Sequence, residues 1–212
     1  MKFKIGDEID SAHCIALKHT FLRCIDSFNE FRFLAENMIN SNKNSNWLSY
    51  KTYNAYADFI LHLHAFFEGC IARENNITNI KNTETMKAHQ IIDNYINAHV
   101  LRILEYKRRD IINNNAPAWE NDISYYSKEE FPINFASEFR TYRNKIAGHV
   151  AHERAHILNL SQFYSKYHKY LYLLYQDSYR HWGKIGQDFP NLADITNFTV
   201  LVKNENLNKL KE

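Results

Sequence analysis

Glycine and proline are scarce in this sequence. Its 212 residues include only 5 glycines and 3 prolines, far below the average usage of about 7% and 5%. Sheet proteins need many tight turns, and tight turns depend on these two residues. Hydrophobic residues make up 45% of the chain and charged residues 24%, which excludes a disordered chain. The sequence therefore predicts an all-α protein, made of long helices with few connections.

Apolar residues recur at steps of three and four along most of the chain, which predicts an up-and-down helical bundle. About five main helices are expected, at residues 9–40, 49–75, 83–112, a segment beginning near Pro132, and 160–182. Between the third and fourth helices lies a loop at 113–131, and loops of this length are often functional. We expect a single helical domain at 1–182 and a partly ordered tail at 183–212.

The charge and the cysteines bound the class of protein. A formal charge of +2 predicts no wholesale coating of nucleic acid but is compatible with a local basic patch. The three cysteines form no CxxC pair and are expected to be reduced thiols. The start of the chain lacks the apolar core of a signal peptide, and no apolar stretch approaches about 18 residues. These features predict a cytoplasmic protein with no membrane partner.

The segment from 140 to 149 carries the most chemistry. It holds three cations, one amide and one imidazole: Arg140, Arg143, Asn144, Lys145 and His149. An Arg beside a His suits phosphodiester chemistry on RNA, because the guanidinium binds phosphate oxygens and the imidazole transfers a proton near pH 7. The RNA can supply its own 2′-hydroxyl as nucleophile, so neither a metal nor a cofactor is expected.

The spacing of Arg143 and His149 raises a geometric question. On a continuous helix the two side chains would point about 120° apart and would not meet. Gly148 commonly ends a helix in the left-handed conformation, so a helix that stops at Ala147 would let His149 fold back toward Arg143. Alternatively, two copies of the helix meet across a dimer axis and pool their Arg and His groups.

Arg143-Asn144, followed after four residues by His149, resembles the Arg-x(4–6)-His motif of the HEPN superfamily. HEPN domains are small all-helical bundles that usually dimerise, and many are metal-independent endoribonucleases of toxin–antitoxin and phage-defence systems. The architecture resembles that family over about residues 50–182. The resemblance implies a homodimer that binds RNA, with an antitoxin protein as a further partner.

The resemblance also implies roles for individual residues. Arg143 and His149 correspond to the catalytic pair, and Asn144 to the polar position that contacts substrate or fixes the Arg. Arg140 and Lys145 would add positive potential for substrate binding. Glu68, one turn after His64 in the second helix, is one candidate to orient Arg143, and Glu138 is a competing partner.

A second motif overlaps the first. His152, Glu153 and His156 satisfy HExxH, in which two His on one helix face bind zinc and the Glu activates water. Arg154 occupies a position that zinc peptidases keep uncharged, so a metal-dependent hydrolase with His152 and His156 as metal ligands is the third hypothesis.

The second hypothesis is a non-catalytic helical domain of the same fold. It would bind a partner protein or a nucleotide through aromatic side chains around the long loop, at Trp119, Tyr125 and Tyr126. Six tyrosines between residues 164 and 179 could stack on bases, but we expect them to pack in the bundle core or in a dimer interface.

Overall fold

The computed structural model describes residues 1–41, 45–80, 85–148, 159–184 and 198–203. Its elements are, in chain order, α1 (Glu8–Ser41), α2 (Asn46–Glu74), α3 (Thr85–Ile112), the 3₁₀ helix η2 (Ile123–Tyr126), α4 (Phe135–Tyr142), the π-helix η3 (Arg143–Gly148) and α6 (Leu160–Trp182). Within the described residues no strand forms, and Lys2 and Ile77 make only an isolated antiparallel bridge. The prediction of an all-α protein is confirmed.

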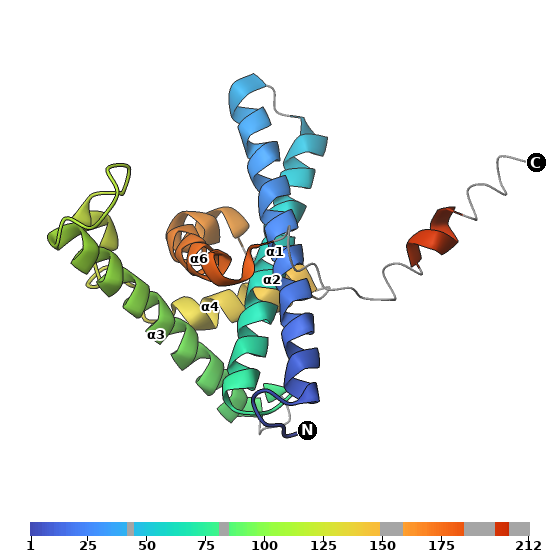
Figure 1. Cartoon of the computed structure of the whole chain (residues 1–212). Coiled ribbons are helices and arrows are strands. Elements are labelled where there is room, and N and C mark those ends of the chain that lie inside the picture. The colour runs from blue at the N-terminus through green and yellow to red at the C-terminus, as the bar shows by residue number, and fades with distance from the viewer. Residues whose placement is uncertain (42–44, 81–84, 149–158, 185–197, 204–212) are drawn as a thin grey trace, which may run out of the picture.

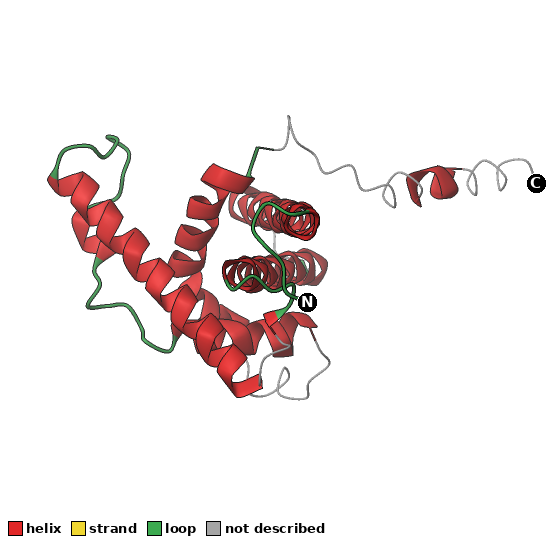
Figure 2. Cartoon of the chain, turned by 60° about the horizontal axis from the view of Figure 1, so that its bottom comes forward, coloured by secondary structure: helices red, strands yellow, loops and turns green. Residues whose placement is uncertain are grey.

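The helices α1 and α2 form a long antiparallel hairpin, and α3 leaves the lower end of that hairpin at an angle (Figure 1). Between α3 and the hairpin lies α6, whose aromatic side chains pack against α1 and α2 and which also contacts α3. Figure 2 looks nearly along the hairpin, whose two helices appear end-on, and shows α3 running beside them. The shorter α4 lies against α2 and α3.

Local capping explains where the helices begin. Asn159 accepts a hydrogen bond from the backbone N–H of Gln162 at 3.0 Å, so α6 begins at Leu160, as the sequence predicts. Ser45 caps α2 in the same way through Leu48, and α2 therefore begins three residues before the predicted Ser49. Pro132 does not enter a helix, because its carbonyl accepts from Phe135 in a turn and α4 begins only there.

The core is aromatic. Phe21 packs against Phe66 with ring centroids 4.7 Å apart, and Phe28 packs against Tyr175 at 4.6 Å. Three of the six tyrosines of α6 are buried in this core, namely Tyr167, Tyr170 and Tyr175. They pack as expected, whereas Tyr164 and Tyr179 remain partly exposed.

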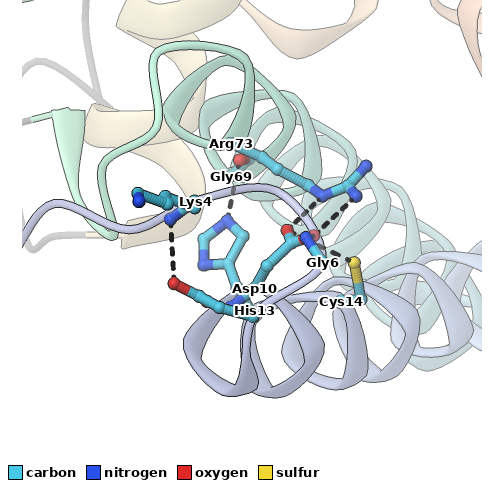
Figure 3. A network of polar contacts seen from close by, with 8 residues as sticks. Lys4, Gly6, Asp10, His13, Cys14, Gly69 and Arg73 are labelled. Atoms are coloured by element: carbon cyan, nitrogen blue, oxygen red, sulfur yellow. Dashed lines mark hydrogen bonds and ion pairs between the residues drawn. The ribbon is translucent and has the colours of Figure 1, made fainter.

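A partly buried ion pair joins the first turns of α1 to the last turn of α2 (Figure 3). Arg73 donates through Nε and Nη2 to the two carboxylate oxygens of Asp10, at 2.6 and 3.0 Å. The backbone N–H of Gly6 donates to the same carboxylate at 2.8 Å. These contacts lower the pKa of Asp10 to about 2, with the Arg73 hydrogen bond as the largest cause. Beside them His13 contacts the carbonyl of Gly69 at 3.0 Å.

Two lysines fix segments that follow helices. Lys18 of α1 donates through Nζ to the carbonyl oxygens of Trp182 and Lys184, at 2.5 and 3.0 Å, so a cation covers the carbonyl end of α6. Lys107 of α3 forms a mostly buried ion pair with Glu120 in the loop after α3, and the Tyr126 hydroxyl donates to the same carboxylate. Tyr126 is buried, so it is not part of an aromatic surface of the loop.

Candidate functional site

The Arg143 segment follows directly from α4. In α4 the residues Phe135, Ala136, Phe139 and Tyr142 are buried, which fixes one face of the helix against the core. The backbone then continues as the π-helix η3 through Gly148, one residue beyond the predicted end at Ala147, and His149 lies outside the described residues. π-helical turns are rare and occur frequently at functional sites.

Arg143 is held by two side chains. Its Nη2 donates to Glu68 Oε2 at 3.2 Å, and its Nη1 donates to Asn144 Oδ1 at 2.7 Å. The side chains of Arg143 and Glu68 are only 17% and 15% exposed. Of the two candidate partners, Glu68 is therefore the one that the structure pairs with Arg143, across the contact between α2 and η3.

The Arg143 guanidinium retains hydrogen-bonding capacity. A guanidinium has five N–H donors, and the contacts with Glu68 and Asn144 use two of them. The Nε atom is buried and has no hydrogen-bond partner among the described residues. Leaving a buried donor unpaired costs about 1–3 kcal/mol, and such a group calls for an explanation in terms of strain or function.

Glu68 also lies beside a buried residue of its own helix, α2. One turn earlier, the fully buried His64 places its Nδ1 3.8 Å from Glu68 Oε1. The His64 ring packs edge-on against Phe139 of α4 with centroids 4.9 Å apart. Glu68 is thus fixed between a buried imidazole and an arginine, which limits where the Arg143 side chain can lie.

The other cations of this segment are placed differently. Arg140 donates through Nε and Nη2 to Asp93 of α3, at 3.1 and 2.8 Å. These hydrogen bonds raise the pKa of Arg140. Arg140 is therefore held by α3 while Arg143 is held by α2. Lys145 is half-buried within η3.

The remaining predicted site residues lie outside the described residues. These are His149 of the Arg–His pair, and His152, Glu153 and His156 of the HExxH motif. In the part of the chain that the structure describes, no group of three His, Cys, Asp or Glu side chains is placed to hold a metal ion.

Sequence reasoning missed a second polar cluster, on α3 and α6. His99 Nε2 lies 2.9 Å from Asp177 Oδ2, and Arg102 Nη2 lies 3.1 Å from His99 Nδ1. Because a guanidinium can only donate, Nδ1 of His99 accepts the hydrogen bond from Arg102. The Nε2–H of His99 then donates the hydrogen bond to Asp177. The hydrogen bond from His99 lowers the pKa of Asp177. No motif signals this pair, because 78 residues separate its members.

The cluster borders a cavity of about 240 Å³ whose lining includes Cys70 and Tyr95. Burial raises the pKa of the Cys70 thiol to about 12, so this thiol is protonated near neutral pH and is a weak nucleophile. Tyr95 donates to Glu74 at 2.8 Å. We therefore interpret these contacts as links between helices.

Comparisons of the sequence and the structure with known proteins identify no relative. No protein-family model matches the sequence, and neither a curated protein nor a solved structure matches the chain. The fold places the chain in the all-α class. None of the described helices combines the length and the apolar character that crossing a membrane requires.

Proposed function

We propose that this protein is a HEPN-like, metal-independent endoribonuclease. The observation that carries the proposal is the state of Arg143, which Glu68 and Asn144 orient while its buried Nε–H has no partner among the described residues. An oriented guanidinium with free donors is suited to binding two oxygens of a phosphate. The position of Asn144 beside it agrees with the role of the polar residue in the Arg–Asn–His motif.

In the proposed reaction the 2′-oxygen of the RNA attacks the adjacent phosphorus. The P–O bond to the 5′-oxygen of the next nucleotide breaks, which leaves a 2′,3′-cyclic phosphate and a 5′-hydroxyl. His149 moves a proton between the attacking or leaving oxygen and solvent, which typically contributes about 10²–10⁴-fold to the rate. Arg143 offsets the negative charge that builds up on the phosphate oxygens.

The proposal extends to the assembly. A homodimer would bring two copies of the Arg143 segment into one groove, where Arg140 and Lys145 add positive potential for RNA. A protein antitoxin would act by covering that groove. The expected compartment is the cytoplasm.

The test is RNA cleavage in the presence of EDTA. The wild-type protein should cut single-stranded RNA, and Arg143→Ala and His149→Ala should each lower the rate by about 10²–10³-fold, the usual loss for one electrostatic or proton-transferring group. Arg143→Lys should also be impaired, because an ammonium lacks the planar fork of donors. Arg23→Ala, which removes an exposed cation of α1, is the matched control and should cut normally.

Intact RNA with the wild-type protein, or equal cutting by Arg143→Ala, His149→Ala and the control, would refute the nuclease proposal. A gel that separates cyclic-phosphate ends from other ends also tests the chemistry, because a metal-activated water would leave different termini.

One observation favours a non-catalytic binding domain as the second candidate. The Arg143 side chain is only 17% exposed and its charge is balanced by Glu68, as expected if the pair only joins η3 to α2. In that case Glu68→Gln should lower the free energy of unfolding while no variant and no wild-type preparation cleaves RNA. Under the nuclease proposal, Glu68→Gln should instead change the cleavage rate of protein that remains folded.

A further inference from the structure

A basic and aromatic groove runs between α3 and α6, away from Arg143. One cleft of about 590 Å³ is lined from α3 by Arg102, Tyr106 and Arg109, and from α6 by Arg180. The three α3 residues follow one another at helical spacings of four and three, so they share one face over about 10 Å of helix. We call this cleft and its continuation the α3–α6 groove.

The groove continues over α6 into a second cleft of about 520 Å³. Arg180 and Tyr179 of α6 line it, together with Trp119 of the loop after α3 and Arg32 of α1. Arg180 belongs to both clefts. The two clefts therefore form one path, with Arg180 at the junction.

The cations of the groove outweigh its carboxylates. Arg109 and Arg180 are exposed, and neither has a carboxylate partner within hydrogen-bond or ion-pair distance among the described residues. Of the two carboxylates that line the first cleft, Glu105 pairs with Lys128 at 3.3 Å, whereas Asp177 accepts a hydrogen bond from His99 and interacts electrostatically with Arg180 and Arg102. Three arginines, Arg102, Arg109 and Arg180, thus share the first cleft with one carboxylate that no lysine or arginine pairs with directly, so a chain with a formal charge of only +2 carries an excess of positive charge along this path.

Aromatic rings lie next to these cations with their surfaces open to solvent. Trp119 is 79% exposed, Tyr179 44% and Tyr106 42%. The guanidinium carbon of Arg109 lies 5.5 Å from the centre of the Tyr106 ring, a geometry in which the cation and the ring support each other. Exposed aromatic side chains on a basic path are the features with which proteins bind unpaired bases and the phosphates between them.

We propose that the α3–α6 groove binds a single strand of RNA, with Arg109 and Arg180 on phosphates and with Tyr106 and Tyr179 stacked on bases. The choice of RNA rests on the proposed nuclease function, whereas the choice of a single strand rests on the rings, since bases in a duplex do not expose their faces. No residue of α4 or η3 lines either cleft. The groove is therefore a substrate-holding surface apart from the Arg143 segment.

Fluorescence anisotropy with the full-length protein tests this proposal. The probe is a fluorescein-labelled 12-nucleotide 2′-O-methyl RNA of mixed sequence, which lacks the free 2′-hydroxyl and so stays intact whether or not the protein is a nuclease. We expect the double variant Arg109→Ala/Arg180→Ala to bind at least about tenfold more weakly and to lower the slope of log K against log salt by about 1.4, which is about 0.7 for each lost phosphate contact.

The double variant Tyr106→Ala/Tyr179→Ala should also weaken binding by about tenfold or more, but with an unchanged salt slope, because stacking releases no counterions. The matched control is Arg23→Ala/Lys166→Ala, which removes the same charge from exposed positions outside both clefts and should bind like the wild type. Circular dichroism confirms that each variant is folded.

Three results would overturn the groove proposal: no binding of the probe by the wild type at about 50 mM salt, equal weakening by the control pair, or equally tight binding of a duplex of the same sequence. Failure of the nuclease proposal looks different. In that case no RNA is cleaved, yet the groove variants still lose affinity for the uncleavable probe while Arg143→Ala keeps it.

Discussion

Asp10 is a charged residue inside the contact between α1 and α2. Its carboxylate accepts hydrogen bonds from Arg73 and from the backbone of Gly6, and both favour the ionised form. The pKa of Asp10 therefore falls from 3.8 to about 2. Removing the carboxylate leaves Arg73 without its partner, and because the Arg73 side chain is 33% exposed, the loss should be smaller than for a fully buried pair.

The first prediction concerns the contribution of the Asp10 carboxylate to stability and its dependence on pH. A carboxylate with a lowered folded-state pKa stabilises the fold above its unfolded pKa and loses that contribution as the pH falls toward the folded value. Asp10→Asn should therefore unfold at a lower urea concentration than the wild type near neutral pH. The difference should shrink as the pH falls from about 4 to about 2. Asp26→Asn, which changes an exposed carboxylate of the same helix, should show neither effect.

Urea unfolding followed by circular dichroism at several pH values measures both effects. A difference between wild type and Asp10→Asn that stays constant down to pH 2 would show that the ionised carboxylate is not what stabilises the contact.

The residues of the candidate site differ in how far the sequence could place them. The sequence alone identifies Arg143 and Asn144, because the motif that they form is local. The sequence offered Glu68 and Glu138 as equal partners of Arg143, since the choice depends on how α2 packs against η3 over a separation of 75 residues. Of the groove residues, Trp119 and Tyr179 stand out in the sequence as aromatic side chains, whereas Tyr106, Arg109 and Arg180 give no signal, because helical spacing on α3 alone does not reveal what faces it.

At the scale of elements, α6 is organised by a row of stacked rings. His168 stacks on Tyr164 with centroids 4.4 Å apart and lies 6.0 Å from Tyr172, at successive turns of the helix. Its Nδ1 lies 3.1 Å from the hydroxyl of Tyr56 in α2. Burial lowers the pKa of His168 from 6.5 to about 4, so the neutral imidazole is the form that fits between the helices.

A second prediction follows for α6. Between about pH 6.5 and about pH 4, His168 binds a proton in the unfolded chain but stays neutral in the folded protein. The free energy of unfolding should therefore fall as the pH drops through this range, by about 3 kcal/mol at most. His168→Phe keeps a ring in the row and should flatten this part of the stability profile. His181→Phe, at an exposed position near the end of the same helix, should leave the profile unchanged. Chemical denaturation at each pH gives the profile, and an equally steep slope in His168→Phe would contradict the assignment.

The helices themselves were largely predictable. The bounds of α6 agree with the sequence because its apolar period is regular and Asn159 and Gly183 flank it. The start of α4 and the extent of η3 were not predictable. Pro132 is compatible with the first turn of a helix, and equally with the turn in which its carbonyl accepts a hydrogen bond from Phe135. Gly148 is compatible with a helix end as well as with the π-helix that includes it.

At the scale of the whole molecule, the nuclease proposal makes a prediction about subunits. If Arg143 of one chain acts with His149 of its partner, Arg143→Ala and His149→Ala are each inactive, but a heterodimer of the two contains one intact site. Mixing equal amounts under conditions that exchange subunits should then restore about one quarter of the wild-type activity, since about half of the dimers are mixed and each has one of two sites.

Cleavage of a labelled RNA by the mixture, compared with each variant alone, measures this rescue. Doubling the amount of a single variant is the control and should restore nothing. An inactive mixture whose subunits have exchanged, shown by a tag on one variant, would place both groups of each site in a single chain.

The contact from Lys18 to the carbonyl end of α6 spans 164 residues, to Trp182. During synthesis α1 leaves the ribosome long before α6 does, because domains emerge from the N-terminus first. The ammonium of Lys18 therefore remains hydrated until translation has passed residue 184. This contact can therefore close only after α6 has been synthesised, so α1 and α2 can pair before it forms.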